Sequence, residues 1–388
     1  MGNKNKGPAI EKLEIDINSS DEEDYNEYFN DIKDKDEKVY ESYNFKDKFF
    51  EYFQKKKKKN ISNFYLKSNL VKNSYAFRQL THTFTTFKSI NDILFLIYST
   101  ENNSLVCINL DKFKIITIIK RAYKNHCYSL RHYLDTINKR DILISLFDIN
   151  VIKLWDIKNF ECIICLKHIY TNEKMFSVYL LGENNMNYII TSNYGRDKNN
   201  TEPVKVYDTN GKFIKLINES NERTLILYTF YDKDLSKNFI ITGNFNNVIA
   251  YDFTSNTIYH KYFDVQNDKP HSDIIIFKED NITKLIESCN DGCIRIWDFH
   301  SCLLLNKINL EYHEKNQYSL CLWDDSHLFV GCVNKIALVN YKENKIVDYY
   351  EQEENPLTLQ KVYISKYGEC LISQDLGDEP IKFWIKQK

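Results

Sequence analysis

The stretch Ser288–Lys307 reads SCNDGCIRIWDFHSCLLLNK. It contains a polar turn that ends in Asp291-Gly292, then an apolar run, Cys293–Trp297, that closes on the dipeptide Trp297-Asp298. An Asp-Gly pair between apolar runs favours a β-hairpin, because glycine adopts positive φ without strain and aspartate tolerates it. A second turn and another apolar run, Cys302–Ile308, follow. The stretch therefore predicts short antiparallel strands joined by tight turns.

The pattern of Cys293–Trp297 recurs along the chain at a nearly constant period. Successive units, aligned on Trp297, are separated by 42 to 52 residues, and the longest step contains a polar insertion, Tyr194–Glu202. The aligned positions are Ile108, Trp155, Tyr207, Tyr251, Trp297, Val339 and Trp384. Seven units of one pattern predict a repeat protein in which every unit packs against its neighbours.

A strand that ends in Trp-Asp at this period resembles the WD-repeat family, whose repeats are four-stranded blades of a β-propeller. The segments Arg131–Trp155 and Asn187–Asn193 are also similar to a group of uncharacterised protist WD-repeat proteins. The resemblance covers about residues 61–388. It implies an all-β fold, a seven-bladed β-propeller, and by itself it implies no activity.

The last blade lacks one strand, because the chain stops after Ile381–Lys386. An open sheet edge is an aggregation hazard, so the ring needs another strand to close it. The apolar run Phe64–Val71 is available before the first blade. We expect this N-terminal strand to pair with the strand around Lys382–Ile385.

The resemblance further implies a buried hydrogen-bond chain in a blade, from a His through a Ser or Thr to a turn Asp and the Trp. Blade five offers His271, Ser288, Asp291 and Trp297 for it, with Ser288 offset by one residue from the usual place. Blade two also offers Ser145, with one extra turn residue. The expected structural network comprises His126, Asp148, Trp155, Asp156, Tyr207, Asp208, Tyr251, Asp252, His271, Ser288, Asp291, Trp297, Asp298 and Trp384.

This His–Ser–Asp set is also the chemistry of a hydrolase triad. The G-x-S-x-G nucleophile elbow is absent from the sequence, as are the P-loop, G-x-G-x-x-G, H-E-x-x-H and EF-hand patterns. The sequence therefore predicts no catalytic residues, no cofactor and no metal, and a protein that is not an enzyme.

Charge and cysteine usage narrow the class of protein further. Charged residues make up 27% of the chain and the net charge is -2, which argues against broad nucleic-acid binding as the main function. A membrane is likewise not expected as a partner. The ten cysteines are scattered through expected strands and suit small apolar fillers in a reducing compartment. Cys162 and Cys165 form a C-x-x-C pair, but residues three apart on a strand face opposite sides of the sheet and cannot hold one metal. With no signal peptide and no apolar run of transmembrane length, we expect a cytoplasmic or nuclear protein.

Residues 1–60 differ in composition from the rest. They are rich in Asp and Glu, and low hydrophobicity with clustered charge predicts a disordered arm. Ser19 and Ser20, followed by acidic residues, suit an acidophilic kinase, while an unmodified acidic arm is an equal alternative. An aromatic-rich stretch follows, and the arm ends in the lysine run Lys55–Lys59, which suits a solvated run, a nuclear import signal or an anionic-surface patch.

Together these features favour a non-enzymatic scaffold, a monomeric propeller within a complex, whose loops contact partner proteins. Positions at expected loops or strand ends are candidate contacts, and for each the alternative of plain surface or packing stays open. They are Arg131, His132, Tyr194, Arg196 and Asn290. The competing hypothesis is an adaptor that binds nucleic acid or membrane through Lys55–Lys59, and the two differ in salt dependence.

Overall fold

The computed structural model describes most of the chain after residue 63. The described ranges are 64–71, 84–100, 103–124, 126–147, 151–167, 174–194, 204–217, 224–244, 246–265, 269–310, 317–352, 355–375 and 381–386. The predictions for the arm 1–60, for Ser19 and Ser20, and for Lys55–Lys59 lie outside these residues, and so does the boundary between arm and propeller.

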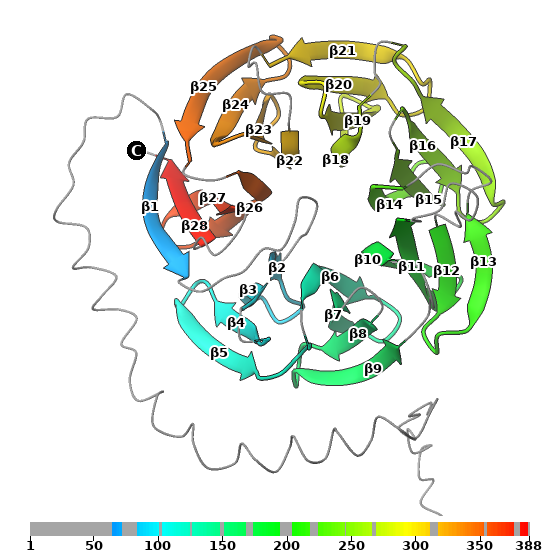
Figure 1. Cartoon of the computed structure of the whole chain (residues 1–388), viewed down its shortest axis with the longest axis vertical. Coiled ribbons are helices and arrows are strands. Elements are labelled where there is room, and N and C mark those ends of the chain that lie inside the picture. The colour runs from blue at the N-terminus through cyan, green and yellow to red at the C-terminus, as the bar shows by residue number, and fades with distance from the viewer. Residues whose placement is uncertain are drawn as a thin grey trace, which may run out of the picture. The chain divides into compact units, whose positions relative to one another are not determined.

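The described residues form seven four-stranded antiparallel sheets arranged in a ring (Figure 1). Each sheet is one blade of a β-propeller. From the innermost to the outermost strand, blade one is β2 (Phe84–Lys88), β3 (Leu94–Ser99), β4 (Leu105–Asn109), β5 (Lys114–Ile119); blade two is β6 (Cys127–Asp135), β7 (Arg140–Phe147), β8 (Val151–Asp156), β9 (Glu161–Lys167). Blade three is β10 (Lys174–Glu183), β11 (Met186–Tyr194), β12 (Val204–Asp208), β13 (Phe213–Ile217); blade four is β14 (Ile226–Asp232), β15 (Lys237–Gly243), β16 (Val248–Asp252), β17 (Thr257–Tyr262).

Blade five contains the stretch Ser288–Lys307. It consists of β18 (His271–Glu279), β19 (Ile282–Cys289), β20 (Cys293–Asp298), β21 (Leu304–Asn309). Blade six is β22 (Gln317–Leu322), β23 (His327–Cys332), β24 (Lys335–Asn340), β25 (Lys345–Glu351). Blade seven is β26 (Pro356–Ile364), β27 (Gly368–Asp375), β28 (Ile381–Lys386), β1 (Phe64–Val71). The prediction of a seven-bladed, all-β propeller is confirmed.

Blade seven joins the two ends of the described chain. Strand β1 pairs antiparallel with β28, with Tyr65 opposite Ile385 and Asn69 opposite Lys382. This is the predicted closure by an N-terminal strand. The seven innermost strands then complete the ring, since each contacts the next: β2, β6, β10, β14, β18, β22, β26 and again β2 (Figure 1).

Seven apolar clusters fill the interfaces between neighbouring blades. In each interface, the residue aligned with Trp297 packs on the preceding blade. Trp297 lies among blade-four residues such as Phe239 and Tyr262, while Trp384 lies among blade-six residues such as Phe329. The corresponding residues of the other blades are Ile108, Trp155, Tyr207, Tyr251 and Val339. The sequence period therefore marks the contact that holds each blade to its neighbour.

The outer hairpin of blades one to six repeats two local features. One residue near the end of the turn has a positive φ, which allows the chain to reverse its direction within a few residues. These residues are Phe113, Phe160, Gly211, Asn256, Cys302 and Asn344. A one-residue β-bulge then follows in the outermost strand, opposite the position aligned with Trp297.

Candidate functional site

The aspartate of the Trp-Asp dipeptide holds the outer turn of its blade. The side chain of Asp298 accepts hydrogen bonds from the backbone amides of His300 and Ser301. Burial raises the pKa of this carboxyl, but these hydrogen bonds outweigh burial and leave the pKa of Asp298 below its usual value. Equivalent side-chain contacts to turn amides are made by Asn109, Asp156, Asp208, Asp252 and Asn340.

Two tryptophans at this position bind a serine hydroxyl of the second strand. The Nε1–H of Trp155 donates to Ser145 Oγ at 2.9 Å, and that of Trp384 donates to Ser373 Oγ at 2.9 Å. Burial without a partner would cost each indole N–H roughly 1–3 kcal/mol. The sequence pattern included Ser145 but missed Ser373. His126 is half-buried and its ring meets Tyr128 edge-on, whereas Asp148 lies outside the described residues.

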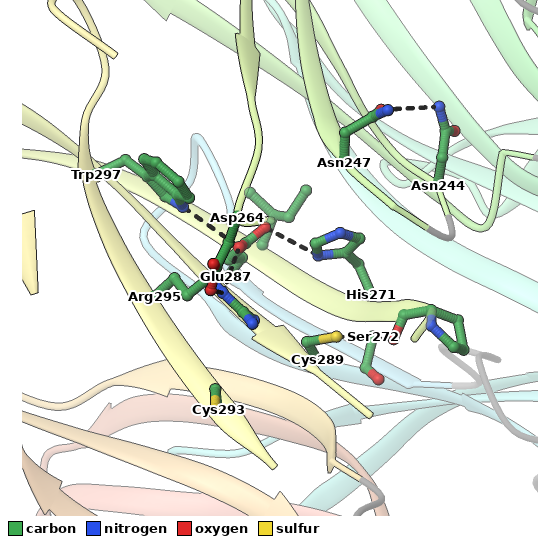
Figure 2. Close-up of polar contacts among 12 residues, drawn as sticks. Asn244, Asn247, Asp264, His271, Ser272, Glu287, Cys289, Cys293, Arg295 and Trp297 are labelled. Atoms are coloured by element: carbon green, nitrogen blue, oxygen red, sulfur yellow. Dashed lines mark hydrogen bonds and ion pairs between the residues drawn. The ribbon is translucent and has the colours of Figure 1, made fainter. Parts of the chain in front are cut away.

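In blade five Glu287, and not the predicted Ser288, lies between His271 and Trp297 (Figure 2). Glu287 Oε1 accepts the Nε1–H of Trp297 at 3.3 Å, and Glu287 Oε2 lies 2.9 Å from His271 Nδ1. The assignment of Ser288 to this chain of contacts is therefore wrong. Consecutive residues of a strand face opposite sides, and Glu287, not Ser288, shares its face with Trp297.

Arg295 extends this cluster (Figure 2). Its guanidinium is fully buried, with Nε 2.7 Å from Asp264 and 3.9 Å from Glu287, and it also pairs with Asp291. Burial raises the pKa of Asp291, but the bond from Arg295 and the amide of Cys293 hold it below its usual value. Because Asp264 follows β17 of blade four, Arg295 fastens the connection between blades four and five.

His132, a candidate contact residue, packs between blades one and two. Its ring stacks on Phe87 with a centroid distance of 3.9 Å, and Nε2 lies 2.8 Å from Asp141 Oδ1. Burial lowers the pKa of His132, although the hydrogen bond to Asp141 raises it. These contacts favour a packing role for His132.

Arg131 lies on an innermost strand of the ring beside aromatic residues of the next two blades. Its Cζ lies 4.0 Å from the ring centre of Tyr179, and Tyr179 meets Tyr228 edge-on at 6.1 Å. Asp273, on the innermost strand of blade five, accepts the amides of Ile274 and Leu320 at 2.8 Å. Burial raises the pKa of Asp273 to about 6, while these amides and the charge of Arg131 lower it. Arg131 was among the residues predicted from the sequence to contact a partner, whereas Tyr179, Tyr228 and Asp273 were not.

Among the remaining candidate contacts, the structure describes the side chain of Asn290 alone. Asn290 lies in the turn between β19 and β20, where its Oδ1 accepts the hydroxyl of Ser272 at 2.7 Å. Tyr194 ends β11, but its side chain is not among those described, and Arg196 lies outside the described residues. Whether these residues bind a partner stays a prediction.

One end of the ring carries all the turns between first and second strands and between third and fourth strands. We call it the turn face. Polar contacts bridge all seven pairs of neighbouring blades there. They join Ser365 to Asp111, the amide of Ile90 to Asp141, Tyr133 to Asn187, Asn238 to the carbonyl of Gly182, His300 to Asp232, Tyr341 to Glu279, and Lys361 to the carbonyl of Trp323. The turns are therefore held on a connected frame.

The turn face also exposes large apolar side chains. They lie at the turn between first and second strands of six blades, and the most exposed of them, Tyr363, is 66% exposed. The set is Ile90, Leu134, Ile137, Met186, Tyr231, Leu235, Ile282 and Tyr363. They come from six blades and are therefore spread around this face, where exposed apolar side chains can contact a partner protein. No single sequence motif marked this set, because its members come from different repeats.

The described residues lack the features of several other kinds of site. Among them, no group of three or more His, Cys, Asp or Glu side chains could hold a metal ion. The hydroxyl of Ser288 is buried and makes no hydrogen bond with the described residues, so it has no adjacent base there. In the same part of the chain, no helix is long and apolar enough to span a bilayer.

Comparison with known proteins agrees with the fold. No protein-family model and no curated protein matches the sequence. Among solved structures, the crystal structure of BBS1N in complex with ARL6DN, soaked with mercury, matches with a TM-score of 0.60 and 9% identity, over 82% of this chain and 95% of that chain. The same complex soaked with lead matches with a TM-score of 0.59 and 9% identity, over 81% and 97%. This chain therefore shares a β-propeller fold with BBS1N.

Proposed function

We propose that the protein is a WD-type propeller that acts as a non-enzymatic scaffold and binds partner proteins on its turn face. The observation that carries the proposal is the set of exposed apolar side chains on a face whose seven blade junctions are bridged by polar contacts. A rigid frame that presents apolar turns loses little entropy on binding. The comparison with BBS1N, a propeller crystallised in a protein complex, supports the same class of function.

The proposed setting is the cytoplasm or nucleus, with the propeller as a single copy in a larger complex. Seven of the ten cysteines are buried in strands of different blades, where they act as small apolar side chains. Such scattered cysteines suit a reducing compartment.

The test is affinity purification of the tagged full chain from its native cells, compared with a double variant of the turn face, Met186→Glu with Tyr231→Glu. These side chains are 54% and 52% exposed, so charge there should disturb binding and leave folding intact. We expect a stoichiometric partner to copurify with the natural chain and to fall at least tenfold with the double variant, because each buried charge costs binding free energy.

A matched control is Val265→Glu, which adds a charge at a residue that is 84% exposed in the connection between β17 and β18, at the opposite end of the ring. It should leave the partner bound. Equal retention by all three proteins would contradict binding on the turn face. A partner that is lost when residues 1–60 are removed would assign the function to the arm instead.

A further inference from the structure

The C-x-x-C pair of blade two lies on one face of its sheet, contrary to the expectation from a regular strand. Cys162 pairs with Trp155, and Cys165 pairs with Lys153, while the bulge at Ile163 falls between them. Trp155 and Lys153 are two residues apart and share a face, so the bulge turns Cys162 and Cys165 to that same face. The earlier inference that they face opposite sides is wrong, because it assumed a strand without a bulge.

Exposure separates this pair from the other cysteines. Cys162 and Cys165 are both exposed on the outermost strand β9, so they are not core fillers. Cys302 is half-buried, and the rest are buried. The bulge recurs in the outer strands of blades one to six, but only blade two has cysteine at both positions that the bulge brings to one face.

The register also sets the spacing of the two cysteines and the groups around them. Partial desolvation beside the sheet raises the pKa of Cys162, the neighbouring Cys165 raises it further, and the ammonium of Lys153 opposes both. The residues opposite them, Trp155 and Lys153, are two positions apart on β8, and two positions along a strand advance about 6.6 Å. We therefore expect a similar spacing between the Cα atoms of Cys162 and Cys165. Disulfides usually join Cα atoms about 4.4–6.8 Å apart, so this spacing lies near the upper end of the permitted range. A disulfide at that spacing is strained, and strained exposed disulfides are readily reduced.

We propose that Cys162 and Cys165 form a reversible dithiol–disulfide pair whose oxidant is a small disulfide such as oxidised glutathione. One thiolate attacks a glutathione sulfur, forms a mixed disulfide and releases glutathione thiolate. The second thiolate then attacks the protein sulfur of that mixed disulfide and releases the second glutathione. The two cysteines lose two electrons, oxidised glutathione gains them, and the two thiol protons pass to the released glutathiones.

Trypsin isolates the pair in one peptide, which makes the test direct. Cleavage after Lys158 and Lys167 releases residues 159–167, NFECIICLK, with both thiols and no other cysteine. The folded full chain is equilibrated with reduced and oxidised glutathione in varied ratio, quenched with acid, and treated with N-ethylmaleimide before digestion. We expect a peptide that lacks two hydrogen atoms and carries no maleimide, and we expect excess reduced glutathione to reverse this.

The variant Cys165→Ser should stop at a single glutathione on Cys162, while Cys302→Ser should leave the oxidation of the pair unchanged. Both changes are at partly or fully exposed sites, and circular dichroism checks that the variants fold. A peptide with two maleimides at every glutathione ratio would overturn the proposal. A peptide with two glutathiones would overturn it as well, because it would show that the thiols react independently.

Discussion

At the scale of single residues, Trp297 binds a carboxylate where Trp155 and Trp384 bind a serine hydroxyl. Glu287 is buried and also contacts His271 and Arg295, so it serves three groups at once. Glu287→Ala would leave them without this carboxylate. We expect the free energy of unfolding to fall by about 3–5 kcal/mol, the cost of breaking a buried charged pair.

The matched change in blade two is Ser145→Ala, which removes only the hydroxyl that accepts the Trp155 N–H. We expect it to cost about 1–3 kcal/mol. Urea denaturation of both variants beside the natural chain gives the two values. If Ser145→Ala lowers the unfolding free energy as much as Glu287→Ala or more, the contacts of Glu287 stabilise the fold no more than the Ser145–Trp155 hydrogen bond does.

Asp273 predicts a pH dependence of stability. Burial raises the pKa of Asp273 in the folded protein to about 6, whereas its pKa in the unfolded chain is about 4. Between these values the folded state binds more protons, so the contribution of Asp273 to stability falls as pH rises through this window. Relative to Asp273→Asn, we expect the natural chain to lose about 2–3 kcal/mol of unfolding free energy between pH 4 and pH 7.

Chemical denaturation of both proteins across that pH range measures this difference. Asp273→Asn also loses one of the amide contacts from Ile274 and Leu320, but that cost does not vary with pH. The control is Asp92→Asn, because the Asp92 side chain is 87% exposed. A constant difference between the natural chain and Asp273→Asn at every pH would show that burial does not raise the pKa of Asp273.

At the scale of elements, β1 decides whether blade seven has a fourth strand. Removal of residues 61–75 would leave the edge of β28 unpaired and expose the hydrogen-bonding groups that now meet β1. We expect the shortened chain to form soluble aggregates or precipitate, as measured by size-exclusion chromatography with light scattering. Removal of residues 1–60 is the control, since it keeps β1. A monodisperse monomer without residues 61–75 would contradict this role of β1.

Strands and turns carry local signals, and these could be predicted from the sequence. Phe64–Val71 was predicted as a strand and forms β1 in the structure. Its partner β28 could also be predicted, because the ring has to close. Registers and bulges carry no such signal. An offset of one residue separated Ser288 from Glu287, and one bulge residue, Ile163, reversed the geometry of Cys162 and Cys165. The partner of Asp273 in the next blade, Leu320, also follows only from the fold.

At the scale of the whole ring, every blade shares an apolar cluster with each neighbour, so blades are not independent folding units. Ile108 lies in the cluster between blades one and seven, which contains Phe383 but none of the four tryptophans. We expect Ile108→Ala to cost about 2–5 kcal/mol, because the buried cavity it leaves is lined by residues from both blades. During urea denaturation, tryptophan fluorescence and far-ultraviolet circular dichroism should report the same decrease in unfolding free energy.

The fluorescence comes from Trp155, Trp297, Trp323 and Trp384, which belong to blades two, five, six and seven. Blades two and five take no part in the Ile108 cluster, so their signal shifts only if the ring unfolds as one unit. Long repeat arrays often lose this cooperativity, whereas a closed ring has no free end from which unfolding can spread. If circular dichroism shows an early transition that fluorescence does not follow, the blades unfold separately and ring closure does not couple them.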